Sequence, residues 1–487
     1  MLRLTSILSL LTIILTTFSC RKDDIVTDSS AQLTFSVDTL IVDTVFATIG
    51  STTRRITVYN HNDKTVNVST IAVAKGTGSQ FRINVDGFSG NVHSNIEIEG
   101  NDSLFIFIEV TIDPNNVLSP FVVEDDIVFV TNGNQQSVHL AAWGQNAHYF
   151  TPKVFPTNGL PKYSCLDGDC NGSLPPINQT WVNDKPYVIY GYLVIDSADV
   201  LNIDPGVKIH LYNKSGIWVY KGGNLNINGT KADPVIFQGT RLDYSFKDVP
   251  GQWDRIWINE GSVNNVFNYA VIKNAYVGIQ AETLPFEPNT AISSNKLILN
   301  NCEIHNASAV GLLATNFIIE SENTLITNCG QYNLLVTGGG KYVFNHATIA
   351  NYWPDGVRQT PTVYAQNYYQ DVNGNTQVRN IDSLNFKNCI IYGNIDNEFA
   401  IETLAPGIIN YAINYSIIKT TTNLTGNVGN NLLNPANYIF IDPFIHNYHL
   451  ITGSVANNIG ITSSVAFDHD GVTRGSPPDV GAYENVN

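Results

Sequence analysis

Short apolar runs recur in the second half of the chain and share one frame. Each run places a small residue and a branched residue two positions apart, so both side chains face the same side of a strand. The central isoleucines stand at 272, 304, 326, 349, 391 and 418, so the successive steps are 32, 22, 23, 42 and 27. A recurring step near 22 residues between short strands predicts a stack of structural repeats. The runs are Ala270–Asn274, Cys302–Asn306, Thr324–Asn328, Ala347–Asn351, Cys389–Gly393 and Ser416–Lys419.

Two further columns keep the same frame. An asparagine ends four of the runs, and asparagine tolerates left-handed backbone at a corner. A glycine or polar residue followed by an aliphatic one forms the other column, at 216–217, 255–256, 278–279, 311–312 and 333–334. Three columns in one register predict a coil of about 22 residues with three strands per turn. Longer steps are then loops inserted at corners. The asparagines are Asn274, Asn306, Asn328 and Asn351.

These columns resemble the pectate-lyase-like superfamily of right-handed parallel β-helices, over residues 181–487. The resemblance implies an all-β solenoid. In lyases of this fold, calcium-binding carboxylates and a basic residue line one sheet, and in its hydrolases aspartates cluster on successive coils. The alternative for the pattern itself is a β-sandwich whose spacing is coincidental.

Alternating apolar and polar residues with regular turn signals predict a β-sandwich over residues 33–146. The order of Val58–Asn60, Asp125–Ile127 and Leu140–Gln145 resembles immunoglobulin-like domains of the abnormal-spindle and hydin type. That resemblance implies a spacer or a contact module. The predicted all-β chain is therefore a sandwich followed by a β-helix.

A stretch rich in Pro, Gly and Asn, residues 147–180, reads as a connector between the two domains. It contains Cys165 and Cys170, which we expect to close a small loop as a disulfide in an oxidising compartment. A calcium site on Asp167 and Asp169 is the alternative for this loop.

The first twenty residues have the features of a targeting segment. Arg3 precedes the apolar stretch Leu4–Leu15, which is too short to span a bilayer. Thr17–Cys20 resembles a bacterial lipobox, which implies that Cys20 carries the lipid; an ordinary signal peptide is the alternative. Arg21–Asp24 is similar to the surface-export signal of Bacteroidota-type lipoproteins. We expect a lipid anchor in the outer membrane, a polar tether over 21–32 and surface exposure, with the periplasmic face as the alternative.

The net charge of the chain limits the classes of binding partner that it can have. The 487 residues carry a formal net charge of −16, and only 14% of them are charged. An acidic surface argues against nucleic-acid binding and against docking on anionic lipid through a basic face. A local basic cleft that binds an anionic sugar stays compatible with this composition.

The last segment, from about residue 440, has an ordered set of turn and aromatic residues. Asp442-Pro443, Tyr448–Leu450 and Pro478–Glu484 resemble the closing segment of bacterial secreted β-helix proteins. The resemblance implies a cap that hides the open end of the coil. Asp468–Gly471 reads as a turn rather than a metal loop.

The step of 42 between Ile349 and Ile391 predicts an insertion over residues 352–382. Long polar and aromatic loops on a rigid scaffold are common binding sites. The alternative is a loop that only shields outward apolar residues such as Leu325 and Ile390. The weak catalytic candidates in the insertion are Asp355, Arg358, Arg379 and Asp382, and its ligand-binding candidate is Trp353.

Outward positions of the coils offer little catalytic chemistry. Glu303 and His305 form a polar outward pair that we expect to face solvent, and no carboxylates stack on adjacent coils. Trp218 and Trp257 are predicted to point outward on neighbouring coils, where indole faces bind sugar rings. Packing beneath another part of the chain is the alternative. The remaining cysteines, which we expect to be buried free thiols, are Cys302, Cys329 and Cys389.

The sequence therefore predicts a surface lipoprotein whose β-helix binds glycan or protein, without catalysis and without a cofactor other than the calcium alternative. A polysaccharide lyase or glycoside hydrolase acting on one face of the β-helix is the first alternative. A structural or adhesive role is the second.

Overall fold

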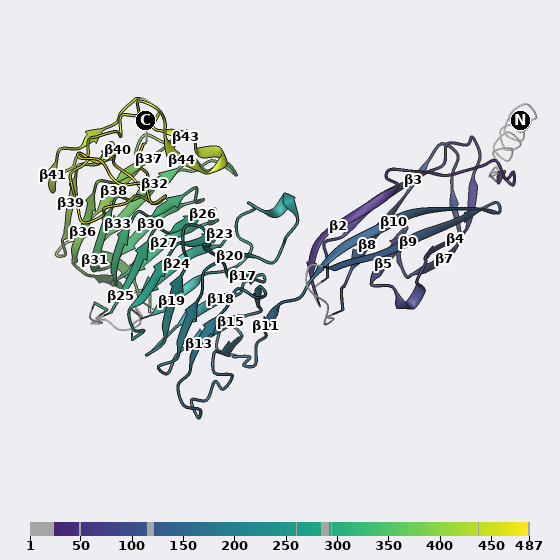
Figure 1. Cartoon of the computed structure of the whole chain (residues 1–487), viewed down its shortest axis with the longest axis horizontal. Helices are drawn as coiled ribbons and strands as arrows, with labels where there is room; N and C mark the ends of the chain where they lie inside the picture. The colour runs from purple at the N-terminus through teal and green to yellow at the C-terminus, as the bar shows by residue number, and fades with distance from the viewer. Residues whose placement is uncertain are drawn as a thin grey trace, which may run out of the picture. The chain divides into compact units, whose positions relative to one another are not determined.

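The computed structural model describes residues 24–47, 50–113, 121–259, 261–283, 292–293, 295–371, 373–436 and 438–485. The chain divides into two compact units, one up to Asn146 and one from Ala147 onward (Figure 1). The targeting segment with Cys20 lies outside the described residues. Within them, no helix is both long and apolar enough to cross a membrane.

The first unit is an immunoglobulin-like β-sandwich around one apolar core. Alternating residues of its strands face that core, as in β8, where every second side chain is buried. The fully buried amide of Asn60 donates to the carbonyls of Lys64, Ile98 and Glu99, which satisfies a corner of the sandwich. One sheet has the order β1 (Thr34–Phe35), β3 (Arg54–Tyr59), β8 (Ser103–Val110), β5 (Phe81–Val85) and β6 (Phe88–Ser89). The other has the order β2 (Thr39–Phe46), β10 (Asn134–Gln145), β9 (Phe121–Thr131), β4 (Val66–Val73) and β7 (Val92–Ile98).

The second unit is a parallel β-helix made of three long parallel sheets (Figure 1). Each coil contributes one strand to each sheet in turn. The eleven-strand sheet has the order β11 (His148–Phe150), β14 (Tyr187–Ile189), β17 (Lys208–Leu211), β20 (Val235–Gly239), β23 (Ala270–Lys273), β26 (Glu303–His305), β29 (Leu325–Thr327), β32 (Thr348–Asn351), β37 (Ile390–Gly393), β40 (Ile417–Ile418) and β42 (Leu432–Leu433).

The other two sheets complete each coil. The nine-strand sheet has the order β12 (Tyr163–Cys165), β15 (Tyr192–Ile195), β18 (Gly216–Val219), β21 (Ile256–Asn259), β24 (Val277–Glu282), β27 (Val310–Thr315), β30 (Tyr332–Thr337), β33 (Val363–Gln366) and β38 (Phe399–Glu402). The ten-strand sheet has the order β13 (Asn178–Trp181), β16 (Val200–Ile203), β19 (Asn224–Asn228), β22 (Asn265–Asn268), β25 (Lys296–Asn300), β28 (Ile318–Glu322), β31 (Gly340–Asn345), β36 (Ile381–Lys387), β39 (Ile409–Asn414) and β41 (Asn427–Gly429).

The inward columns expected from the repeat are confirmed by the strand register. Ile272, Ile304 and Ile326 are successive partners in the eleven-strand sheet. Ile217 and Ile256 are partners in the nine-strand sheet. All five are buried in one continuous core, so apolar stacking along the axis stabilises the solenoid.

Left-handed residues turn the chain at two corners in several of the coils. Asn274, Asn306 and Asn328 have φ of 64°, 55° and 50°, as expected for corner asparagines. Asn351 does not fit this expectation, because it is the last residue of β32 and is extended. The second corner precedes each small inward residue and was not expected from the sequence; its positive-φ residues are Tyr269, Asn301, Asn323, His346, Asn388 and Tyr415.

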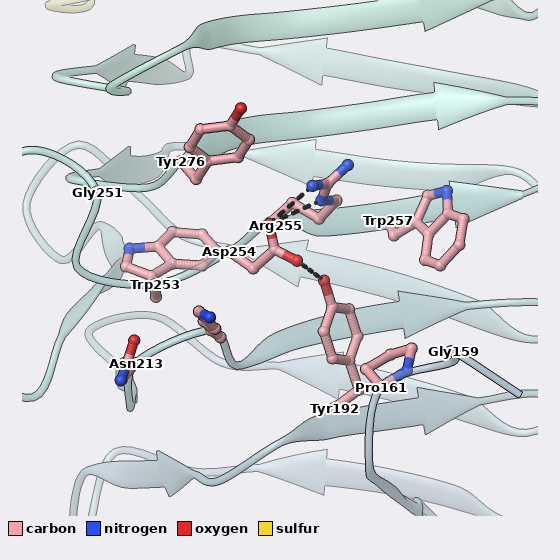
Figure 2. A pocket seen from close by; sticks show the side chains of 11 residues that line it. Gly159, Pro161, Tyr192, Asn213, Gly251, Trp253, Asp254, Arg255, Trp257 and Tyr276 are labelled. Carbon is pink, nitrogen blue, oxygen red and sulfur yellow. Dashed lines mark hydrogen bonds and ion pairs between the residues drawn. The ribbon is translucent and has the colours of Figure 1, made fainter. Parts of the chain in front are cut away.

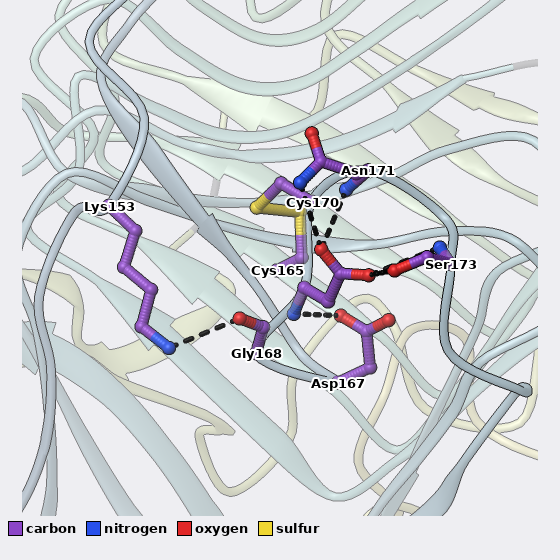
Figure 3. Close-up of a disulfide and its surroundings, with 8 residues drawn as sticks. Lys153, Cys165, Asp167, Gly168, Cys170, Asn171 and Ser173 are labelled. Atoms are coloured by element: carbon purple, nitrogen blue, oxygen red, sulfur yellow. Dashed lines mark hydrogen bonds between the residues drawn. A yellow bond between two sulfur atoms is a disulfide. The ribbon is translucent and has the colours of Figure 1, made fainter.

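The stretch 147–180 is the first coil of the β-helix and not a connector. β11, β12 and β13 pair in parallel with β14, β15 and β16 of the next coil. Its three- and four-residue strands, separated by long Pro- and Gly-rich turns, hide the period in the sequence. Cys165 and Cys170 form a disulfide in one of these turns (Figure 3).

The C-terminal segment, residues 438–485, lies along the flank of the eleven-strand sheet. It includes the hairpin of β43 (Phe440–Asp442) and β44 (Asn447–Leu450), and its apolar side chains pack on the outward Leu325, Ile390 and Ile417. The expected cap over the end of the coil is therefore revised, because these contacts are lateral. This segment, rather than the 352–382 insertion, shields Leu325 and Ile390.

The 352–382 insertion contains a regular strand of the coil as well as extra chain. β33 belongs to the nine-strand sheet, and the surplus forms a hairpin of β34 (Tyr368–Gln370) and β35 (Thr376–Val378). Three short 3-10 helices complete the described secondary structure: η1 (Gly76–Gly78), η2 (Tyr244–Phe246) and η3 (Pro443–Ile445).

Candidate functional site

Two tryptophans stack on the outer face of the nine-strand sheet. Trp218 in β18 and Trp257 in β21 are register partners, with ring centroids 4.8 Å apart and an interplanar angle of 16°. Both point outward, as expected, and both are half-buried. The Trp257 indole N–H donates to Glu282 at 2.7 Å, and the Trp218 indole N–H donates to Asn259. These hydrogen bonds hold the two rings parallel.

A pocket of about 640 Å³ adjoins Trp257 on the same face (Figure 2). Its volume lies in the range of about 300–1,000 Å³ that small-molecule sites occupy. Four aromatic side chains surround a few polar and charged groups, which is the usual make-up of a ligand site. The lining residues are Gly159, Pro161, Tyr192, Asn213, Lys214, Gly251, Trp253, Asp254, Arg255, Trp257 and Tyr276.

A charged network occupies one wall of this pocket. Both Nε and Nη2 of Arg255 donate to Asp254 Oδ1, at 3.0 and 2.9 Å. Nη1 of Arg255 donates to Gln280, and the Tyr192 hydroxyl donates to Asp254 Oδ2. Asp254 and Arg255 thus neutralise each other, while Lys214 adds a positive charge to the lining of a strongly acidic protein.

The network favours binding over proton abstraction. Burial and the neighbouring Asp254 carboxylate raise the pKa of Tyr192 far above its usual value. Burial lowers the pKa of Arg255, but the hydrogen bond and charge of Asp254 outweigh it and leave the pKa raised. Both groups therefore stay protonated near neutral pH, when they donate hydrogen bonds and do not act as bases.

A well-anchored loop, residues 240–255, builds the side of the pocket that precedes β21. The Trp253 indole N–H donates to the Lys273 carbonyl at 2.8 Å. Gln252 Nε2 donates to the Phe246 and Val249 carbonyls at 2.7 and 2.8 Å. The Trp253 contact fixes the loop on the adjacent coil and the Gln252 contacts brace it internally, so the pocket is largely preformed.

The structure does not bring the four catalytic candidates of the insertion together. Asp355 is exposed, and Asp382 lies on β36, 3.8 Å from Lys341. Arg358 points into the protein and pairs with Glu398 at 2.6 Å, with both side chains almost fully buried. Arg379 is half-buried next to the Gly338–Gly340 turn. Among the contacts of the described residues, none joins two of these four side chains.

Trp353 is also separate from the pocket. It is half-buried, and its ring lies against Gly330 at the corner between the eleven- and nine-strand sheets. It lines none of the described pockets.

The Glu303–His305 pair is covered, which corrects the expectation of a solvated face. His305 is 9% exposed, and its ring lies 4.6 Å from the ring of His446 in the C-terminal segment. Glu303 Oε1 is 3.6 Å from His469 Nε2 of the same segment. His446 and His469, which lie 141 and 166 positions further along the chain, therefore cover this pair.

The three free cysteines are buried, and the acidic disulfide loop is held by hydrogen bonds within itself. Cys302, Cys329 and Cys389 are buried free thiols, and burial raises the pKa of each to about 12. In the disulfide loop, the Asp169 carboxylate accepts hydrogen bonds from Asn171 and Ser173 (Figure 3). Across the described part of the chain, no group of three His, Cys, Asp or Glu side chains is placed to hold a metal ion.

Sequence reasoning identified Trp257 but missed the rest of the pocket. A signal was present, because the step of 39 between Ile217 and Ile256 exceeds one coil by nearly as much as the step that marked 352–382. That surplus is the 240–255 loop. Tyr192 and Pro161 come from earlier coils, and no local pattern assigns them to a site.

Similar proteins were found only among solved structures. No protein-family model matches the chain, and no curated protein sequence does. A family 123 glycoside hydrolase from Clostridium perfringens, studied for glycolipid glycan hydrolysis, shares 11% identity over 23% of this chain and 25% of its own, with a TM-score of 0.17. A Porphyromonas gingivalis W83 protein of unknown function shares 12% over 28% and 57%, with a TM-score of 0.18.

A third structure, the ASH/PapD-like domain of human CEP192, shares 10% identity over 26% of this chain and 94% of its own, with a TM-score of 0.17. The chain thus spans a quarter and rather more than half of the first two structures it matches. Likeness this slight says nothing about the ligand of this protein.

Proposed function

We propose that this chain is a non-catalytic surface lipoprotein whose β-helix binds glycan at the pocket beside Trp257. The observation that carries the proposal is the stacked, outward pair Trp218 and Trp257 next to a preformed pocket of mixed aromatic and polar lining. Sugar rings have apolar faces that pack on indole, and their hydroxyls need hydrogen-bonding partners. Tyr276, which is 51% exposed, supplies further ring surface, and Asn213 and Lys214 supply polar groups.

The same lining argues against cleavage. Glycosidic hydrolysis ordinarily needs two carboxylates flanking the bond, and Asp254 is the one carboxylate among the described lining residues. Its oxygens already accept hydrogen bonds from Tyr192 and Arg255. Elimination from a uronate needs a base, whereas Tyr192 and Arg255 hold their protons.

The proposed location follows from the N-terminal sequence. A lipid on Cys20 would anchor the chain in the outer membrane, with Arg21–Asp24 favouring the cell surface. Labelled palmitate should be incorporated by the native chain and not by Cys20→Ser. Protease added to intact cells should digest the protein; protection until the outer membrane is opened would place it on the periplasmic face.

The test of binding is a glycan array probed with the soluble chain beginning after Cys20, followed by calorimetry on the best-binding polysaccharide. Trp257→Ala should weaken binding about tenfold, because an aromatic platform of the site is lost. Trp353→Ala is the matched control, since Trp353 is also half-buried but lines none of the described pockets, and it should leave the affinity unchanged.

The same glycans should be assayed for new reducing ends and for the absorbance of unsaturated uronate. Product formation that disappears in Asp254→Asn would establish an enzyme and refute the non-catalytic proposal. An array without binding would refute the glycan proposal and leave a protein partner, or the structural or adhesive alternative.

A further inference from the structure

A second, smaller pocket adjoins the one beside Trp257. Its volume is about 330 Å³, and Asn213 and Gly251 line both pockets. Gly251 has φ of +74°, and a Cβ atom there would lie 3.0 Å from Ser308 Oγ, so at this position the shared wall has no side chain. The two pockets are therefore neighbours that share the wall formed by Asn213 and Gly251.

The second pocket has aromatic surfaces of its own. Tyr212 follows β17 and is 42% exposed. Phe246 in η2 is half-buried, and the guanidinium of Arg241 lies 3.4 Å from its ring centroid. Arg241 is also held by Asp243 at 3.0 Å, so this wall is ordered.

The loop between the two pockets is fixed to the adjacent coils. Asn274 Nδ2 donates to the Lys247 carbonyl at 2.8 Å, and Asn306 Nδ2 donates to the Asp248 carbonyl at 3.3 Å. A ligand that occupies both pockets therefore binds a preformed surface, and the free-energy cost of ordering the loop is small.

We infer that the second pocket is a subsite for the same glycan, so the ligand is an oligosaccharide that runs from Trp257 across Gly251 to Tyr212. This inference rests on the proposed function and adds a minimum length to the ligand. Trp257 lines only the first pocket and Tyr212 only the second, so a ligand that contacts both side chains extends across Gly251. Longer chains consequently bind more tightly than short ones.

The experiment measures chain-length dependence. Oligosaccharides of two and six residues, prepared from the polysaccharide that binds best on the array, are titrated calorimetrically into the native chain and two variants. Tyr212→Ala should weaken the hexasaccharide about fivefold and leave the disaccharide unchanged, because only the longer ligand reaches the second pocket. Tyr244→Ala is the control: Tyr244 lies on the 240–255 loop and is 77% exposed, but it does not line either pocket.

The outcomes separate the two proposals. Equal affinity of the native chain for both lengths, or a Tyr212→Ala effect that is the same for both lengths or absent, overturns the second subsite while glycan binding at Trp257 stands. A loss in Tyr244→Ala as large as that in Tyr212→Ala also overturns it. If no polysaccharide binds, the proposed function and the subsite fail together.

Discussion

The guanidinium of Arg358 lies inside the β-helix, at the corner that precedes β33. It donates to both oxygens of Glu398, at 2.8 and 2.6 Å, and to Asn394 at 2.9 Å. Glu398 also accepts from the backbone N–H of Thr362 at 3.1 Å. The pair therefore joins two successive coils, and its role is structural.

Removal of one member leaves a buried charge without its partner. Arg358→Met should lower the free energy of unfolding by about 3–5 kcal/mol, measured by urea denaturation. Asp382→Asn breaks the exposed pair with Lys341 and should change it by less than about 1 kcal/mol. If the Arg358→Met chain is as stable as the native chain but no longer binds glycan, the structural role is contradicted and Arg358 belongs to the ligand site.

At the scale of the element, asparagine occupies the corner before the small inward residue in three of four successive central coils, at Asn301, Asn323 and Asn388. The remaining coil has a histidine there. His346 occupies it with φ of 53°, and Asn388 of the next coil donates to His346 Nε2 at 2.9 Å. Burial, with the nearby charges of Arg474 and Lys387, lowers the pKa of His346 to about 2. The imidazole is thus neutral in the folded chain at any moderate pH.

This makes the β-helix sensitive to acid in a defined direction. Above pH 6.5 His346 is neutral in both states; below it the unfolded chain binds a proton that the folded chain excludes, so stability falls. The loss should be about 2 kcal/mol between pH 6.5 and pH 5. His346→Asn, the residue at three equivalent corners, should reduce this loss in urea titrations at pH 7 and pH 5. Equal losses in both proteins would contradict the assignment.

At the scale of the whole molecule, the first coil decides where the β-helix begins. Trp181 is fully buried and stacks on Tyr187 with centroids 4.1 Å apart, and Phe150 packs beside it at 5.1 Å. The residues before 181 also supply Gly159 and Pro161 to the pocket. The coil closes the apolar core at this end.

Two fragments test this boundary. A chain of residues 147–487 should be soluble, unfold cooperatively and keep its glycan affinity, because it forms a compact unit. A chain of residues 181–487 should aggregate, because it exposes the core beneath Trp181 and the edges of three strands. Size-exclusion chromatography and circular dichroism distinguish them. Equal solubility and cooperativity of both fragments would make the first coil dispensable.

The sequence by itself determined the solenoid. Inward positions repeat with the period of the coil, and each must be apolar because it contacts the same position one coil away. That is why Ile272 and Ile304 were correctly assigned inward, and why Trp257, next to the inward Ile256, was correctly assigned outward. The first coil escaped because the steps from it to the next coil are 39 residues in one sheet and 29 in another, so the period of about 22 does not extend to it in those sheets.

Only the tertiary structure decided what lies on the outside of the coil. Outward residues also have neighbours one coil away, but what covers them depends on loops whose path is not encoded locally. The C-terminal segment covers Glu303 and His305, and the pocket joins Pro161, Tyr192 and Trp257 from separate coils. Side chains that lie close in space but far apart in sequence leave no pattern along the chain. The fold could therefore be predicted from the sequence, whereas most of the pocket could not.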